Sequence, residues 1–210
     1  VYPTGLPAPE LSVVRRLVGN GQRALIERAL RWAGVDPGAP GVLDDMVARF
    51  REQYSVHLTE QTALYPGVQS TLRELASRRV AQVVATNKPG AWARRLVEAL
   101  GISAQLTLVL GEDDHGARKP DPRLAQLLCE RVAVPAFETL FVGDSSIDLD
   151  TAAAAGMDLA LCTYGYGDAE TIATARAASA TPNQIPLGTR QRPFVLETLA
   201  ELLTVPGLRR

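Results

Sequence analysis

Residues 139–156 have the sequence TLFVGDSSIDLDTAAAAG. The apolar start of this segment predicts a strand over Thr139–Val142, and the alanine-rich part predicts a helix over Asp148–Ala155. Gly156 is expected to end that helix, because glycine readily adopts the left-handed conformation found there. A further strand is predicted over Leu159–Thr163. The order strand, helix, strand is typical of a parallel sheet covered by helices.

The same alternation continues on the N-terminal side of this segment. Val80–Ala85 is a β-branched run of the kind buried in parallel sheets, and Leu106–Leu110 predicts another short strand. Apolar spacing, proline and glycine predict three helices among the strands: Val68–Ser77, Pro89–Leu100, and one that begins with Asp121 as N-cap and Pro122 at its first position. We therefore predict an α/β fold with a doubly wound parallel sheet.

Residues 1–65 have a different pattern. Apolar residues recur at helical spacing in three places, Leu11–Val18, Leu25–Leu30 and Met46–Leu58, and no strand pattern interrupts them. The pattern changes after Tyr65-Pro66-Gly67. We predict two domains, an all-helical unit over residues 1–65 and an α/β core over residues 66–210.

The composition is ordinary for a globular protein. The 210 residues are 46% hydrophobic and 21% charged, with a formal net charge of −1. That charge offers no basic excess for a phosphate backbone, and no apolar run approaches the roughly 18 residues of a membrane-spanning helix. Cys129 and Cys162 have no metal-binding or disulfide-framework spacing. We expect a cytoplasmic protein that binds neither nucleic acid nor membranes, and no pattern indicates its oligomeric state.

Polar side chains follow three of the predicted strands. Thr86 and Asn87 follow the first, Lys119 lies beyond the second, and Asp144 and Asp148 follow the third. Ligands of open α/β sheets bind at the carboxyl ends of the strands, so these side chains are expected to gather at one edge. A hydroxyl with helix N–H groups can hold a phosphate, a lysine can neutralise it, and carboxylates suit Mg²⁺. The set predicts phosphoryl chemistry.

Each motif also has an interpretation without catalysis. Thr86 and Asn87 would only cap the following helix, and Lys119 would be a solvated turn lysine. Asp148 would only complete a capping box with Ser145. The functional interpretation is favoured because all three motifs end strands in the same sense, which independent caps do not require.

Other reactive residues are given structural roles. His57 and His115 have no ligand-spaced partners and are expected at the surface or in packing contacts. Cys129 lies on an apolar helix face, where a buried thiol is expected. Asp113 and Asp114 are expected in a solvated turn.

The strand-end motifs resemble motifs II, III and IV of the haloacid dehalogenase (HAD) superfamily: Thr86-Asn87-Lys88-Pro89, Lys119-Pro120-Asp121-Pro122 and Gly143-Asp144-Ser145-x-x-Asp148. Within the superfamily, three further segments are similar to bacterial phosphoglycolate phosphatases: Val18-Gly19-Asn20-Gly21, Leu64-Tyr65-Pro66-Gly67-Val68 and Tyr164-Gly165-Tyr166-Gly167. The resemblance extends from about Leu11 to about Gly167.

This resemblance implies a Rossmann-like core, a small helical cap, and Mg²⁺-dependent hydrolysis of a small phosphorylated metabolite through a phospho-aspartate. The expected substrate is 2-phosphoglycolate. The resemblance also implies a role for each matching residue: Thr86 and the Asn87 backbone bind the phosphoryl group, Lys119 neutralises its charge, Asp144 binds Mg²⁺, Asp148 binds or orients the metal shell, and Gly19, Asn20 and Gly21 help to select the substrate. Lys88 receives no assigned role.

One motif of the superfamily is missing. Asp-x-Asp-Gly-Thr, which supplies the nucleophile and the general acid/base, does not occur, and the first aspartate is Asp36 in the helical unit. Missing with it is the strand that the family places centrally, between the Val80–Ala85 and Thr139–Val142 strands. Without this carboxylate no covalent intermediate forms, so we expect this chain to be inactive. Because the sequence begins with Val1, we expect an N-terminally truncated phosphatase.

Two other functions stay open at this point. The first is a pseudoenzyme that binds phosphate ligands without turnover. The second is a receiver-type signalling domain, which also combines acidic residues, threonine and lysine on a doubly wound sheet. The helical unit of residues 1–65 and the Lys119-Pro120-Asp121-Pro122 motif argue against the second.

Overall fold

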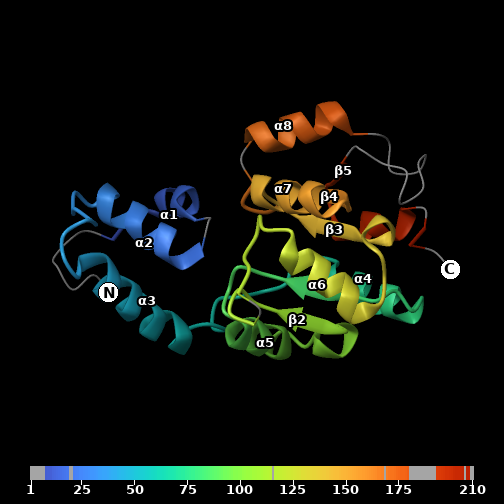
Figure 1. The fold of residues 1–210 in the computed structure, drawn as a ribbon, viewed down its shortest axis with the longest axis horizontal. Coiled ribbons are helices and arrows are strands. Elements are labelled where there is room, and N and C mark those ends of the chain that lie inside the picture. The colour runs from blue at the N-terminus through green and yellow to red at the C-terminus, as the bar shows by residue number, and fades with distance from the viewer. Residues whose placement is uncertain are drawn as a thin grey trace. The chain divides into compact units, whose positions relative to one another are not determined.

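The computed structural model describes residues 8–18, 21–114, 116–167, 169–179, 193–205 and 207–208. The chain forms two compact units, residues 1–61 and residues 62–210 (Figure 1).

Helices are the only secondary-structure elements among the described residues of the first unit. Its helices are α1 (Leu11–Leu17), α2 (Gly21–Trp32) and α3 (Val42–Val56). Ile26 and Leu30 on α2 are buried with Val47 on α3 in one apolar cluster. The guanidinium of Arg28 donates to the carbonyl of Leu17 at 3.0 and 2.7 Å, which satisfies an end carbonyl of α1. The three predicted helices are confirmed.

The second unit alternates strands with helices, and the predicted α/β class is confirmed (Figure 1). Its described strands are β1 (Val83–Ala85), β2 (Leu108–Leu110), β3 (Leu140–Gly143), β4 (Asp158–Cys162) and β5 (Phe194–Leu196). Its described α-helices are α4 (Val68–Ser77), α5 (Gly90–Ala99), α6 (Arg123–Val132), α7 (Ser146–Ala155) and α8 (Ala169–Ala178). Short 3₁₀ helices are η1 (Ser103–Gln105), η2 (Ala136–Glu138) and η3 (Leu199–Thr204).

The strands form two separate parallel sheets rather than one. β1 pairs with β2, and β3, β4 and β5 pair in that order. Val84 lies opposite Val109 in the first sheet, and Val142 lies opposite Ala160 in the second. Among the described residues, the break falls between β1 and β3. These are the two strands between which the resemblance expects a missing strand.

The break leaves β1 and β3 partly open. Every residue of β4, which is paired on both sides, is buried, whereas no residue of β1 or β3 is fully buried. Val142 in β3 is 40% exposed although it sits in an apolar strand. Parallel strands are normally buried on both faces, so this exposure is unusual.

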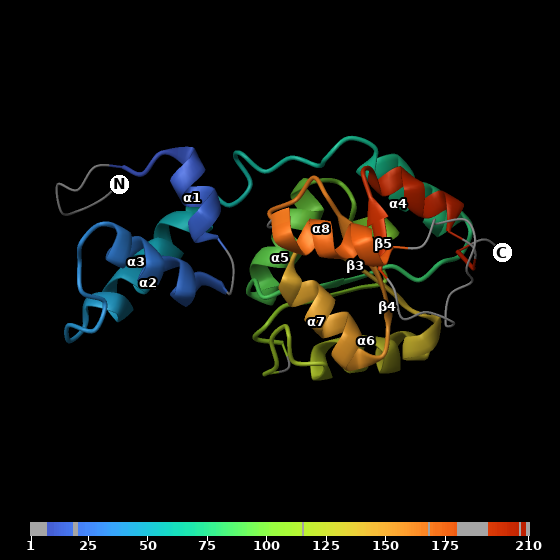
Figure 2. The ribbon, with the colours of Figure 1, turned by 90° about the horizontal axis from the view of Figure 1, so that it is seen from above.

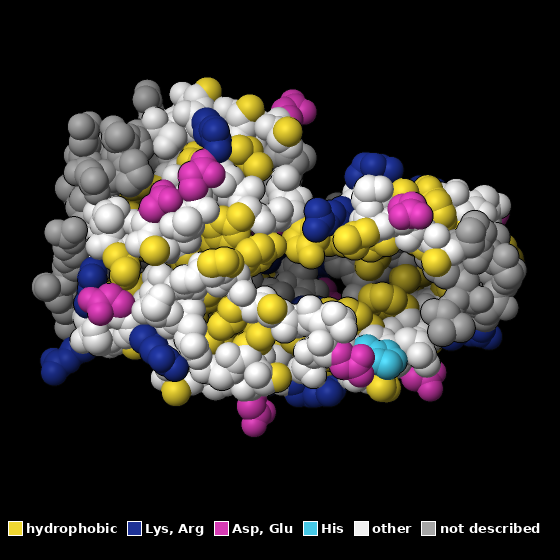
Figure 3. Space-filling view, turned by 180° about the vertical axis from the view of Figure 1, so that it is seen from behind, with side chains coloured by type: hydrophobic (Ala, Val, Ile, Leu, Met, Phe, Trp, Pro, Cys, Tyr) yellow, Lys and Arg dark blue, Asp and Glu magenta, His cyan; other side chains and the backbone are white. Residues whose placement is uncertain are grey.

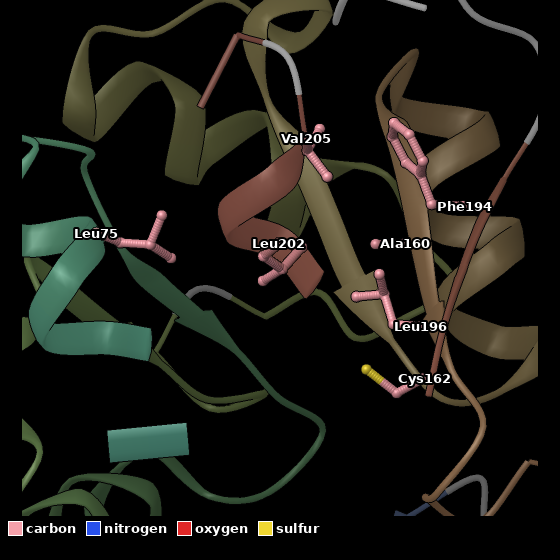
Figure 4. Packing of buried hydrophobic residues seen from close by; sticks show 7 residues of the cluster. All are labelled: Leu75, Ala160, Cys162, Phe194, Leu196, Leu202 and Val205. Carbon is pink, nitrogen blue, oxygen red and sulfur yellow. The ribbon is translucent and has the colours of Figure 1, made fainter. Parts of the chain in front are cut away.

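Helical elements join the two sheets on either side of the break. Leu75 on α4 and Leu202 on η3 belong to a buried cluster with Leu196 on β5 (Figure 4). On the other side α6 packs against α7, and the two helices lie side by side in Figure 2. Leu124 and Leu128 on α6 are buried beneath β1 and β2. The second unit therefore keeps a core although its sheet is interrupted.

The surface mixes charges of both signs. On the face drawn in Figure 3, Lys and Arg side chains alternate with Asp and Glu side chains and gather in no single patch. Arg23 pairs with Asp44 at 2.5 Å and Arg31 with Glu27 at 2.6 Å, and all four side chains are exposed. Exposed pairs of this kind contribute about 0–1 kcal/mol each.

Several predicted boundaries are wrong. β1 begins at Val83 rather than Val80. The residues before it still belong to the end of α4, because Arg79 adopts a left-handed conformation (φ 59°) and the Val80 N–H donates to the Leu75 carbonyl at 3.0 Å. β2 begins at Leu108, two residues after the predicted start. The other boundary changes are smaller: α5 spans Gly90–Ala99 with Pro89 as N-cap, α6 has Pro122 rather than Asp121 as N-cap, α7 begins at Ser146, and β3 and β4 are each shifted by one residue.

Candidate active site

Lys119 and Asp148 form a partly buried ion pair at the carboxyl ends of the strands. Lys119 Nζ lies 2.7 Å from Asp148 Oδ1, with side-chain exposures of 16% and 5%. Nζ also lies 5.7 Å from the centre of the Phe141 ring, close enough for a cation–π interaction. The interpretation of Lys119 as a solvated turn lysine is therefore wrong.

Asn87 fixes the backbone of Lys119. Its Nδ2 donates to the Lys119 carbonyl at 2.9 Å, and its Oδ1 accepts the Lys119 N–H at 2.7 Å. Asn87, two residues after the end of β1, is thereby tied to the segment that follows β2. The resemblance assigned a role to the Asn87 backbone, whereas the structure adds this positioning role for its side chain.

Thr86 lies at the end of β1 but does not cap α5. Its Oγ1 accepts the Lys88 N–H at 3.1 Å within the turn. The first N–H of α5, from Gly90, is instead bound by the Asp113 carboxylate at 2.6 Å. The capping interpretation of Thr86 and Asn87 is therefore wrong.

Asp113 and Asp114 lie in an exposed turn, as predicted, but they also make specific hydrogen bonds. The Asp114 carboxylate accepts the Gly111 N–H at 2.8 Å and pairs with Arg94 at 2.8 Å. The turn therefore holds the end of β2 to the start of α5.

Asp148 completes the capping box that the sequence indicates and also pairs with Lys119. Its Oδ2 accepts the Ser145 hydroxyl at 2.7 Å and the backbone N–H groups of Asp144 and Ser145 at 3.1 and 3.2 Å. Burial raises the pKa of Asp148, but the Lys119 charge and these hydrogen bonds outweigh it and hold the pKa below its usual value. Gly143 permits this approach, because a Cβ there would collide with the Asp148 side chain.

The segment Tyr164-Gly165-Tyr166-Gly167 holds Asp144. The Tyr166 N–H donates to Asp144 Oδ2 at 2.6 Å. A Cβ on Gly165 would collide with the Asp144 carboxylate, and a Cβ on Gly167 would collide with the Asp144 carbonyl. Sequence reasoning quoted these glycines only as part of a resemblance and gave them no role, although two glycines within three residues after a strand are a signal of close backbone approach.

Tyr164 anchors the start of this segment. Its ring meets the Tyr65 ring edge-on with centroids 4.8 Å apart. Burial, followed by a hydrogen bond with Cys162, raises the pKa of Tyr164, and burial likewise raises the pKa of the Cys162 thiol. Both groups are therefore neutral near pH 7 and serve packing.

The donor set fits Mg²⁺ only as a minimal site. Mg²⁺ commonly takes one or two protein carboxylates and completes its octahedron with water and phosphate oxygens. Asp144 and Asp148 are suitable hard oxygen donors, but Asp148 already binds Lys119 and Ser145. Within the described ranges, no group of three or more His, Cys, Asp or Glu side chains is placed to hold a metal. Asp144 is thus the better direct ligand and Asp148 the better orienting group.

Hydrogen bonds link four of the predicted site residues, Asn87, Lys119, Asp148 and Asp144, and Thr86 precedes Asn87 directly. Gly19 and Asn20 lie outside the described residues, while Gly21 begins α2 in the other unit with φ 82°.

The remaining reactive residues lie apart from this network. His57 pairs with Glu60 at 2.9 Å on the surface, and His115 is outside the described residues. Cys129 is buried, as predicted.

Comparison with known proteins gives consistent matches. The model of the haloacid dehalogenase-like hydrolase family matches residues 4–162. The chain is 40% identical over 167 residues to the phosphoglycolate phosphatase of Pectobacterium atrosepticum, covering 80% of this chain and 71% of that protein. It is 35% identical over 188 residues to the phosphoglycolate phosphatase of Escherichia coli, covering 82% and 75%. The crystal structure of a predicted phosphoglycolate phosphatase from Haemophilus somnus matches with a TM-score of 0.77 and 27% identity, covering 95% of this chain and 83% of that one.

Proposed function

The chain belongs to the haloacid dehalogenase-like hydrolase family, and we propose that it forms the scaffold of a Mg²⁺-dependent phosphatase for a small phosphate monoester, with 2-phosphoglycolate as the substrate. The names of the relatives support a phosphatase of this family. The observation that carries the proposal is the connected set Asn87, Lys119, Asp148 and Asp144 beyond the carboxyl ends of three strands. Such an edge is where open α/β sheets bind ligands.

Each residue of the set has a task in this proposal. The Thr86 hydroxyl and neighbouring backbone N–H groups hold the phosphoryl oxygens, and Lys119 neutralises charge that builds during transfer. Asn87 keeps the Lys119 backbone in place, and Asp148 keeps its ammonium directed at the site. Asp144 would hold Mg²⁺, and the bound ion would supply charge compensation at the phosphate.

The reaction also needs a nucleophile that the 210 residues do not supply in an Asp-x-Asp-Gly-Thr motif. In the proposed reaction the first carboxylate of that motif attacks phosphorus while the bond to the leaving alkoxide breaks, and the second carboxyl group of the motif donates a proton to the alkoxide. Water then hydrolyses the phospho-aspartate, which releases inorganic phosphate and restores the carboxylate. We infer that the chain alone does not turn over.

The helical unit is proposed to act as a cap, with Gly19, Asn20 and Gly21 contributing to substrate selection. We also propose that the protein is cytoplasmic and that its binding partner is a small phosphorylated metabolite. Within the described residues, no helix is both long enough and apolar enough to cross a membrane.

A second candidate is a phosphate-binding protein without turnover. The observation that favours it is the missing Asp-x-Asp-Gly-Thr motif, because the remaining groups bind phosphate but cannot form a covalent intermediate. The two candidates differ in what happens when a nucleophile is added.

The test is an extended protein that carries an apolar strand and an Asp-x-Asp-Gly-Thr segment before residue 1. We expect Mg²⁺-dependent phosphate release from 2-phosphoglycolate, abolished by chelation and by Asp→Asn in the added motif. A panel of small sugar and acid phosphates measures selectivity. If the extended protein folds and releases phosphate from none of them, the phosphatase proposal fails and the binding protein is favoured.

A further inference from the structure

Two segments that follow neighbouring strands lie against each other in the second unit. Residues 86–90 connect β1 to α5 and are called here the Thr86 loop. Residues 111–114, Gly-Glu-Asp-Asp, follow β2 and are called the acidic turn. The proposed function places the Thr86 hydroxyl on the phosphoryl group, so whatever holds the Thr86 loop also sets the geometry of the proposed phosphate site.

The two segments approach so closely that two positions have room only for glycine. A Cβ on Gly111 would collide with the Lys88 carbonyl and the Gly90 nitrogen. A Cβ on Gly90 would collide with the Asp114 carboxylate. Both glycines are buried and neither has a positive φ, so close contact rather than backbone conformation requires glycine here.

Hydrogen bonds fix the Thr86 loop at its start, middle and end. The Thr86 N–H donates to the Leu110 carbonyl at 3.1 Å, and the Lys88 carbonyl accepts the Glu112 N–H at 3.2 Å. Asp113 Oδ1 accepts the N–H of the last loop residue, which is also the first of α5, at 2.6 Å. The Asp113 carboxylate therefore holds the end of the loop that the β1–β2 ladder does not reach.

The acidic turn is itself braced. The Asp114 carboxylate accepts the Gly111 N–H at 2.8 Å and two hydrogen bonds from the Arg94 guanidinium at 2.8 and 3.1 Å. Arg94 also donates to the Val109 carbonyl on β2 at 3.2 Å. The turn is thereby fixed to both α5 and β2, and it offers Asp113 a firm base.

These hydrogen bonds decide which backbone donors of the Thr86 loop can reach a phosphate. The N–H groups of Thr86 and Gly90 are bonded as described, and the Lys88 N–H donates to Thr86 Oγ1 at 3.1 Å. Proline, which has no N–H, occupies the position between Lys88 and Gly90. Among the described residues, the Asn87 N–H is the one backbone donor of the loop that has no partner.

We propose that Asp113 is a positioning residue for the phosphate site: its carboxylate closes the N-terminus of α5 and holds the Thr86 loop in the shape that binds phosphate. A phosphate oxygen then accepts from the Thr86 hydroxyl and the Asn87 N–H, and not from the helix N-terminus, which would otherwise attract an anion. The inference rests on the proposed function for the location of the phosphate.

A simpler role for Asp113 predicts the opposite result. If its carboxylate acted only as a negative charge near the site, its removal would strengthen phosphate binding, because repulsion is lost and a helix N–H is freed. If it positions the loop, its removal weakens phosphate binding. The direction of the change therefore separates the two roles.

The probe is inorganic phosphate, titrated by calorimetry into the 210-residue chain with Mg²⁺ present. Asp113→Ala is expected to raise the phosphate Kd at least about tenfold, because the Gly90 N–H loses its charged acceptor. Asp113→Asn loses the charge but keeps an acceptor oxygen, and its Kd is expected to stay within about threefold of the parent's. Hydrogen exchange of the Lys88 and Gly90 amides should speed up in Asp113→Ala and not in Asp113→Asn, with β4 amides unchanged in both.

Asp36→Ala is the matched control. Asp36 Oδ1 also accepts a glycine N–H, that of Gly38 at 2.9 Å, in an exposed turn of the first unit. Its loss is expected to leave the phosphate Kd unchanged. Arg94→Ala loosens the acidic turn from its exposed side and is expected to raise the Kd about threefold, so it tests the same inference if Asp113→Ala does not fold.

An unchanged or lower phosphate Kd in folded Asp113→Ala would overturn the inference. So would a loss in Asp113→Asn as large as that in Asp113→Ala, or, where Asp113→Ala does not fold, parent-like binding by Arg94→Ala. The parent chain separates this result from failure of the proposed function. If the parent binds no phosphate, the proposed phosphate site fails and the inference fails with it. If the parent binds phosphate and the variants bind it equally well, the inference fails alone.

Discussion

Lys119 Nζ and Asp148 Oδ1 lie 2.7 Å apart, and the ion pair links the ends of two sheets that share no ladder hydrogen bond within the described residues. Lys119 belongs to the segment after β2, and Asp148 lies in the first turn of α7 after β3. The pair is mostly buried, so each charged group needs the other to offset the free-energy cost of its removal from water. One contact therefore serves both the stability of the second unit and the proposed chemistry.

Lys119→Met removes the cation and leaves the Asp148 carboxylate buried without its charged partner. We expect the free energy of unfolding to fall by about 3 kcal/mol. Urea unfolding followed by circular dichroism measures the change. Arg23→Ala is the control, because it breaks an exposed ion pair with Asp44 and is expected to have little effect. Equal losses for the two variants would contradict the importance of the buried pair.

Asp148 is expected to make stability depend on acid pH. Its pKa is lower in the folded chain than its ordinary value, so the unfolded chain binds the proton more readily. The stabilisation is complete above the ordinary aspartate pKa of about 4 and is lost as the pH falls through the lower folded-state pKa.

Urea midpoints measured from neutral to acid pH check this dependence. Asp148→Asn is expected to flatten the acid slope. Asp44→Asn, whose side chain is 72% exposed, serves as the control and is expected to keep the slope. An unchanged slope in Asp148→Asn would show that other carboxyl groups govern acid unfolding.

Gly165→Ala is expected to displace Asp144, because the new Cβ would collide with its carboxylate. Binding of Mg²⁺ should weaken by about tenfold or more while most of the fold is kept. Mg²⁺ titration by calorimetry measures the affinity, and thermal unfolding measures the fold. Gly38→Ala, where the added Cβ would lie 3.3 Å from a flexible carboxylate in the first unit, is the matched control. Normal Mg²⁺ binding in Gly165→Ala would exclude this role.

Asn87→Asp keeps the shape of the side chain but loses the amide donor that bonds the Lys119 carbonyl. Asn87→Ala loses both hydrogen bonds to Lys119 and leaves two partly buried backbone groups unpaired. We expect Asn87→Ala to lower the free energy of unfolding by about 2 kcal/mol. In the extended protein both variants should lower kcat more than they raise KM, because Lys119 is misplaced. A change in KM alone would contradict this positioning role.

The alternating strands and helices, and the residues at their ends, could be predicted because their signals are local. Thr139–Val142 is an apolar run, and Gly156 ends α7 in the left-handed conformation with φ 70°. Parallel sheets place strand ends at one edge, so Asn87, Lys119 and Asp148 could be expected together before any contact was known.

The elements beyond Gly167 could not be predicted. α8 is rich in Ala and Thr and shows no apolar stripe, and β5 is only three residues long. The side-chain contacts of the site could not be predicted either. The hydrogen bond from Asn87 to Lys119 joins residues 32 positions apart in the sequence, and that from Tyr166 to Asp144 joins residues 22 positions apart. Such pairings depend on tertiary packing that no local pattern encodes.

The most direct test is the effect of Lys119→Met on kcat/KM for 2-phosphoglycolate in the protein extended with an Asp-x-Asp-Gly-Thr strand, with Mg²⁺ present. Conditions are chosen in which circular dichroism finds the variant folded. If Lys119 neutralises the transferring phosphoryl group, kcat/KM should fall by at least about a hundredfold. A folded Lys119→Met variant with kcat/KM close to that of the parent would contradict a phosphoryl-transfer site at the edge where Lys119 meets Asp148.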